Sequence, residues 1–82
     1  MEMEMTTGML WYDDDPRLDL AAKIEKARGY YLKKYGRSPN LCFVNPAMLS
    51  KPLPRVGEIS VQEDQMILLN HLWLGVRGSV SV

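Results

Sequence analysis

The sequence of 82 residues contains one cysteine and one histidine, and this scarcity limits the chemistry that it can support. The single cysteine, Cys42, excludes an intrachain disulfide and any zinc site built from several thiolates. No glycine-rich phosphate loop, metal-ligand spacing or catalytic motif is recognisable, so neither a metal nor a cofactor is expected. No apolar run has the length of a membrane span, and residues 1–5 lack the features of a signal peptide. We therefore expect a cytoplasmic protein.

The composition is that of one small globular domain. Hydrophobic residues make up 46% of the chain and charged residues 24%, which argues against disorder. Residues 1–8 are expected to form a flexible arm or an added edge strand, and residues 9–82 a single α+β domain. A chain of this size buries only roughly 60 to 65% of its surface, so association with a second copy would add stability.

The net charge is zero, but the charges are segregated along the chain. Residues 1–25 carry seven acidic and two basic side chains, whereas residues 26–55 carry seven basic side chains and no acidic one. These segments can attract each other within one fold or between two subunits, or they can steer a charged partner. We favour attraction within the fold or between subunits.

An amphipathic helix is expected over residues 16–35. The preceding run Asp13-Asp14-Asp15-Pro16 offers Asp15, or its neighbour Asp14, as an N-cap before a proline at the first helical position, and Gly36 can end the helix. The residues expected to face the core recur at helical spacing: Leu20, Ile24, Ala27, Tyr31 and Tyr35, with Ala21 and Leu32 beside them. The lysines Lys23, Lys26, Lys33 and Lys34 are expected on the polar side.

Four segments have the composition of strands, and they are residues 9–12, 41–44, 56–61 and 66–76. A helical turn is expected over residues 45–49, where Asn45 precedes Pro46. Residues 62–65 are expected to turn the last two strands into a hairpin, and residues 77–82 to form a tail or an edge strand.

The order of elements, strand, helix, then three strands, predicts an α+β fold. We expect a single-layer sheet of three to four strands with one main helix packed on one face. The run from Met66 to Val76 is apolar at both odd and even positions, so both of its faces need cover. One helix can cover only one side of the sheet. The long last strand therefore predicts a homodimer or higher oligomer that pairs sheets, with Leu69, His71 and Trp73 as candidate interface residues.

Chemistry is considered at three places in the sequence. The triplet Asp13-Asp14-Asp15 offers carboxylates to a hard cation such as magnesium, but helix capping uses at least one of them, and no metal site is expected. Nucleophilic catalysis would need Cys42 beside His71, yet Cys42 is flanked by apolar residues that favour an inert thiol. His71 is expected to be a strand residue at an interface or under the hairpin, with a place in a ligand pocket as the alternative.

The third place is a candidate basic face of the helix, which comprises Lys26, Tyr30, Lys33, Lys34 and Arg37. Such a face could contact phosphates while the tyrosine stacks on a base. The balanced net charge argues against nucleic acid as the partner.

Three hypotheses about function follow. The first is a small non-enzymatic interaction module that homo-oligomerises through its sheet and contacts an unidentified protein. The second is a nucleic-acid-associated accessory protein that uses the basic face. The third is a small enzyme or metal-binding protein with the acidic triplet or His71 at its site; it ranks last because one helix and one sheet seldom enclose a pocket of a few hundred Å³.

Overall fold

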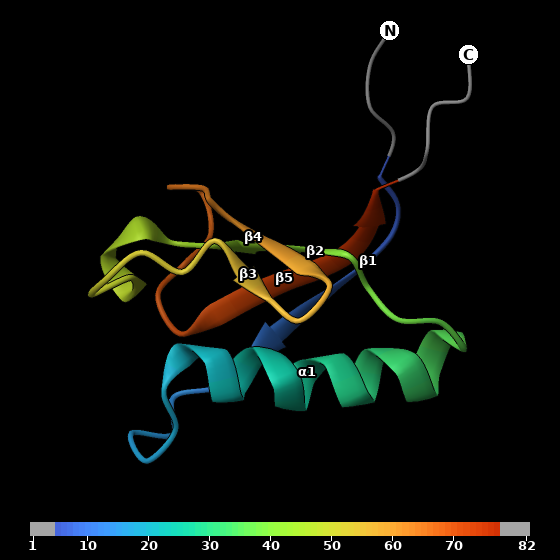
Figure 1. The fold of residues 1–82 in the computed structure, drawn as a ribbon, viewed down its shortest axis with the longest axis horizontal. Helices are drawn as coiled ribbons and strands as arrows, with labels where there is room; N and C mark the ends of the chain where they lie inside the picture. The colour runs from blue at the N-terminus through green and yellow to red at the C-terminus, as the bar shows by residue number, and fades with distance from the viewer. Residues whose placement is uncertain (1–4, 78–82) are drawn as a thin grey trace, which may run out of the picture.

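A computed structural model describes residues 5–77, which form a five-stranded mixed sheet with one α-helix against one face (Figure 1). The elements in chain order are β1 (Met5–Tyr12), α1 (Leu20–Tyr35), β2 (Leu41–Val44), the 3₁₀ turn η1 (Pro46–Met48), β3 (Arg55–Val56), β4 (Ile59–Glu63) and β5 (His71–Arg77). The α+β class is as expected, and the sheet has five strands where three to four were expected. Residues 1–4 and 78–82, including most of the expected tail, lie outside the described residues.

The spatial order of the strands is β1-β5-β2-β4-β3. Strand β5 is antiparallel to both of its neighbours, β1 and β2, so β1 and β2 run parallel to each other. Helix α1 connects these two parallel strands while β5 lies between them, which is the split β-α-β arrangement. The last strand is therefore inside the sheet, between the edge strand β1 and the central strand β2.

The expected hairpin of the last two strands is wrong. Strand β4 pairs with β2 in parallel, and β5 pairs with β2 from the opposite side. The segment expected as one strand over 56–61 instead contains a tight turn, in which Gly57 has a φ of 60° and Val56 pairs with Ile59. The left-handed conformation at Gly57 costs little without a Cβ atom, so the chain can reverse there and form β3.

The last strand also begins later than expected. Asp64 accepts a hydrogen bond from the backbone N–H of Met66 through its side chain, at 2.9 Å, which starts a turn. A second turn joins the N–H of His71 to the carbonyl of Leu68, with Asn70 at a φ of 66°. Residues 66–70 are therefore loop, and Leu69 is not on the strand.

Helix α1 ends as expected and begins four residues later than expected. Gly36 adopts a φ of 77°, and its N–H donates to the carbonyl of Leu32 at 2.8 Å. At the other end the N-cap is Asp19, whose carboxylate accepts a hydrogen bond from the N–H of Ala22 at 2.8 Å. The expectation that Asp15 or Asp14 caps the helix is wrong, because Asp15 belongs to a separate turn.

The core lies between α1 and the sheet face that it covers. Ile24, Ala27 and Tyr31 of the helix are fully buried there. The sheet contributes a continuous apolar layer, which comprises Cys42, Val44, Val56, Ile59, Val61, Leu72, Leu74 and Val76. Leu20, Ala21 and Tyr35 pack at its margin, as the helical spacing predicts, whereas Leu32 is exposed.

Candidate functional site

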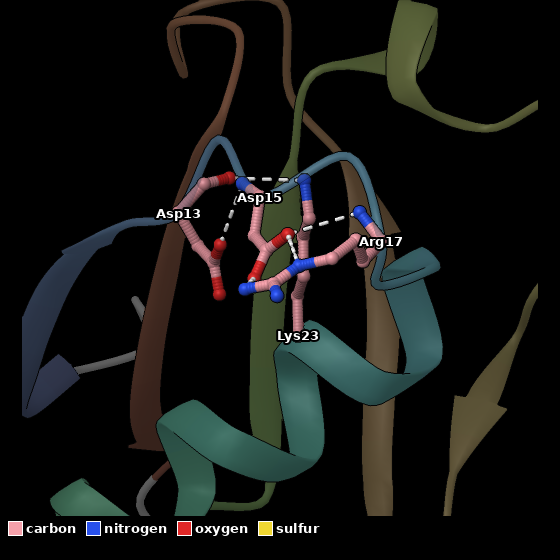
Figure 2. Close-up of polar contacts among 4 residues, drawn as sticks. All are labelled: Asp13, Asp15, Arg17 and Lys23. Atoms are coloured by element: carbon pink, nitrogen blue, oxygen red, sulfur yellow. Dashed lines mark hydrogen bonds and ion pairs between the residues drawn. The ribbon is translucent and has the colours of Figure 1, made fainter.

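The acidic segment after β1 forms a compact loop rather than a helix start (Figure 2). The N–H of Asp13 donates to the carbonyl of Asn70 at 2.8 Å, which continues the pairing of β1 with the segment before β5. One carboxylate oxygen of Asp13 accepts the N–H of Asp15 at 3.0 Å. The loop is therefore held by its own aspartates, as such residues commonly do in turns.

Asp15 and Arg17 form an ion pair across the exposed side of this loop. The guanidinium donates through Nε and Nη2 to the two carboxylate oxygens, each at 3.0 Å, and the N–H of Arg17 donates to Oδ1 at 2.9 Å. The side-chain and backbone hydrogen bonds from Arg17 hold the pKa of Asp15 below its ordinary value. Asp15 thus serves the loop as a turn-forming anion.

Lys23 lies beneath the acidic loop, and only 8% of its surface is exposed. Its Nζ donates to the backbone carbonyl of Asp13 at 3.0 Å (Figure 2). The expectation that Lys23 belongs to the polar side of the helix is wrong, because the loop folds over it. Asp13 is equally buried, and its Oδ2 has no hydrogen-bond partner.

The three aspartates do not converge on a common point. Asp14 accepts the hydroxyl of Tyr12 at 2.8 Å, and this hydrogen bond raises the pKa of Tyr12. Over residues 5–77, no three side chains of the histidine, cysteine, aspartate or glutamate types are grouped as a metal site requires. Each aspartate is instead accounted for by a hydrogen bond within the loop.

A pocket of about 500 Å³ lies beside Lys23, open to solvent, between the start of α1, η1 and the loop before β5. Its polar lining includes Asp19, Lys23, Ser50 and Lys51, and the rest is mainly apolar. The carboxylate of Asp19 is already engaged as the helix cap, and Nζ of Lys23 as the donor to Asp13. The pocket offers shape and positive charge, but no nucleophile paired with a base.

Cys42 and His71 lie on opposite faces of the sheet. Cys42 faces the helix, where burial raises its pKa to about 12, and it is paired in register with the core residue Leu74. His71 is paired with Tyr12 on the other face, and the two rings lie 5.0 Å apart between centroids. A thiol and an imidazole separated by the sheet cannot exchange a proton, so this pair has no nucleophilic chemistry.

The face of the sheet away from α1 bears a row of apolar and aromatic side chains. Cross-strand register places Leu10 and Phe43 on either side of Trp73, and Tyr12 beside His71. We call these five residues the outer row. Leu10 is 61% exposed and Tyr12 56% exposed, while the rings of Phe43 and Trp73 lie 5.8 Å apart. Helix α1 lies against one face of the sheet (Figure 1), and the outer row is on the other face, which no α-helix of the described residues covers.

The outer row contains two of the three candidate interface residues. His71 and Trp73 lie in it, whereas Leu69 is exposed in the preceding loop and lines the pocket beside Lys23. The backbone carbonyl of Leu69 still contacts Nδ1 of His71 at 2.9 Å. Leu10, Tyr12 and Phe43 were not singled out from the sequence. Their alternation with Met9, Trp11 and Val44, which face the helix, is the signal that could have identified them.

The candidate basic face is exposed along α1 and beyond it, at Lys26, Tyr30, Lys33, Lys34 and Arg37. The ring of Tyr30 stacks on Trp11 with centroids 4.6 Å apart, and Nζ of Lys34 lies 5.2 Å from the centroid of the Tyr35 ring. One face of Tyr30 is therefore occupied within the protein. Tyr30, Lys33 and Lys34 lie together beside residues of β1.

Across residues 5–77, no helix has both the length and the apolar composition needed to cross a bilayer. No protein-family model matches the chain, and no curated protein or solved structure is significantly similar to it.

Proposed function

We propose that this protein is a small non-enzymatic interaction module that forms a homodimer through the outer face of its sheet. The observation that carries the proposal is the outer row, which no helix of the described residues covers. Leu10 and Tyr12 expose more than half of their surfaces, and the other three residues of the row are half-buried. Large apolar residues gathered on one surface of a small protein commonly mark an association site.

A second copy is the occupant that we favour for this face. The outer row contains no aspartate, glutamate, lysine or arginine. The strand residues of that type on the same face of the sheet are Arg55 and Arg77, which lie outside the row. A two-fold axis through the row would place each apolar side chain against another one, as isologous dimers require. Aromatic residues such as Trp73 and Tyr12 are frequent anchors of such interfaces.

Cys42 and His71 lie on opposite faces of the sheet, which supports a non-enzymatic role. The hydrogen bonds that each aspartate of the acidic loop makes to nearby residues support the same role. A buried, unreactive Cys42 is compatible with the reducing cytoplasm, where we place the protein.

The test is the effect of a charge placed in the outer row on the mass in solution. Phe43→Glu should convert a dimer to a monomer, because a carboxylate would have to be desolvated at the interface. Leu68→Glu is the matched control, since Leu68 is an apolar residue that is 69% exposed in the loop before β5. Circular dichroism must show that both variants are folded. A folded Phe43→Glu variant that keeps the parent mass would exclude the outer row as the interface.

Binding of nucleic acid through the candidate basic face remains the rival function. Fluorescence anisotropy with labelled DNA and RNA distinguishes it, since binding by phosphate contacts weakens steeply with salt. We expect no binding at physiological ionic strength. Salt-sensitive binding that Lys33→Glu and Lys34→Glu abolish would replace the interaction-module proposal.

A further inference from the structure

Strand β1 lies at an edge of the sheet. Its register shifts between Met5 and Thr7, and from Thr7 to Tyr12 the pairing with β5 is regular and no bulge interrupts the edge. Within the described residues its one strand neighbour is β5. Met5–Tyr12 contains no proline and no charged residue, although lysine and proline are the usual means of preventing further strand pairing. A long uncharged edge is a template for another extended chain.

The register shows which backbone groups of β1 are available at this edge. The N–H of Asp13 donates to Asn70, and hydrogen-bonded pairs alternate along an antiparallel ladder. Trp11 and Met9 therefore bond to β5, whereas the N–H and carbonyl groups of Leu10 and Tyr12 point away from it. The same alternation turns the carbonyl of Gly8 outward, where it accepts the hydroxyl of Tyr35 at 3.3 Å.

A groove of about 510 Å³ runs beside this edge, between β1 and α1. Its lining is apolar and basic, and comprises Met9, Leu10, Trp11, Tyr30, Lys33 and Lys34. Tyr30 stacked on Trp11 gives the groove an aromatic wall, and the two lysines are exposed. No acidic residue lines it, so the charge of the groove is complementary to an anion.

We propose that the edge of β1 and this groove bind an extended peptide in which acidic and apolar side chains alternate. The peptide would add a strand to the sheet, with backbone hydrogen bonds to Leu10 and Tyr12. The peptide residue opposite Leu10 lies on the outer face with Leu10, so it should be apolar. The residues on either side of it point toward the helix, where acidic side chains can reach Lys33 and Lys34.

This inference names a partner class for the proposed interaction module and does not require the homodimer. The probe is a short fluorescent peptide of alternating glutamate and leucine, and its affinity is measured by anisotropy. Leu10→Pro should weaken binding by about tenfold or more, because proline removes the outward N–H without removing a bond to β5. Leu10→Ala is the control that shortens the side chain and keeps the N–H.

Charge is tested separately from the backbone. Lys33→Glu with Lys34→Glu should also weaken binding by about tenfold or more, whereas Lys51→Glu, an exposed lysine outside the groove, should leave it unchanged. A peptide that is N-methylated at every second residue loses the N–H groups that would donate to the carbonyl groups of Leu10 and Tyr12. It should not bind in the register that uses those hydrogen bonds. The folded Phe43→Glu variant should bind the parent peptide normally, which separates this proposal from the dimer.

Three results would overturn the inference. One is equal affinity of the Leu10→Pro and Leu10→Ala variants in their folded form, because strand addition would then be absent. Another is equal affinity for a peptide in which lysine replaces glutamate. The last is the absence of saturable binding to the parent protein. In that last case, self-association that the lysine reversals abolish would assign the edge to a second copy.

Discussion

The indole of Trp73 lies directly over Gly8 on the outer face of the sheet, crossing from β5 to β1. A Cβ atom built on Gly8 would overlap the six-membered ring of Trp73 at a separation that side chains do not tolerate. Gly8 is therefore part of the packing of the outer row. Its lack of a side chain lets the indole approach the strand closely.

Gly8→Ala should destabilise the protein by about 1 to 3 kcal/mol, because the new methyl group must displace the indole. Urea denaturation followed by circular dichroism measures the change in the free energy of unfolding. The same substitution in a Trp73→Leu background should cost less, since the overlapping ring is absent. Equal costs in the two backgrounds would mean that Gly8 is required for another reason.

Asp19→Ala should lower the free energy of unfolding by about 1 kcal/mol through loss of the N-cap of α1. Asp14→Ala is the control, because Asp14 is exposed in the same acidic segment and bonds only to the hydroxyl of Tyr12. Thermal or urea unfolding of the two variants gives the comparison. A larger loss for Asp14→Ala would restore the capping role to the triplet.

Lys23→Met should destabilise the protein by about 1.5 to 3 kcal/mol, because it leaves the buried carbonyl of Asp13 without its charged donor. Lys26→Met provides the matched comparison on the exposed side of the same helix and should change stability by less than about 0.5 kcal/mol. Chemical denaturation of both variants tests the burial of Lys23. Similar stabilities would contradict the loop-covered position shown in Figure 2.

Cys42 should make the protein less stable as the pH rises from about 8.5, the ordinary pKa of a thiol, toward 12. Burial raises the pKa of Cys42 in the folded state, so the unfolded thiol loses its proton first and the equilibrium shifts toward unfolding. Stability measured against pH should decline less in a Cys42→Ala variant. The native thiol should also react slowly with a maleimide at pH 8 and rapidly in urea; equal rates would show that Cys42 is accessible.

The parts of the fold that the sequence predicts are those fixed by local chemistry. Residues 41–44 are uniformly apolar and form β2 at the expected bounds, and Asn45 before Pro46 begins the expected helical turn. Gly36 ends the helix because a left-handed residue is needed there. Each of these depends on a few neighbouring residues.

The features that were missed depend on competition between similar local signals. Asp15 before Pro16 resembles a helix cap, but its bonds to Arg17 close a turn, and Asp19 caps the helix instead. Asp64 and Asn70 convert the start of an apolar run into loop. The expected start of the helix, at the aspartate-rich run, is therefore too early, and so is the expected start of the last strand, at the apolar run.

The position of β5 between β1 and β2 could not be predicted from local sequence. A run that is apolar at both odd and even positions is compatible with a strand that is covered on both faces. It is equally compatible with an interior strand whose aromatic face no helix covers. The pairing of β5 with both β1 and β2 is a long-range choice. It brings Trp73 between Leu10 and Phe43 and so creates the outer row.

The mass of the protein in solution is the most direct test of dimerisation through the outer row. Sedimentation equilibrium at micromolar concentration should give twice the mass of the chain for the parent protein and for Leu68→Glu, and the mass of one chain for folded Phe43→Glu. A parent protein that sediments as a single chain, or a folded Phe43→Glu variant that remains a dimer, would contradict the proposal.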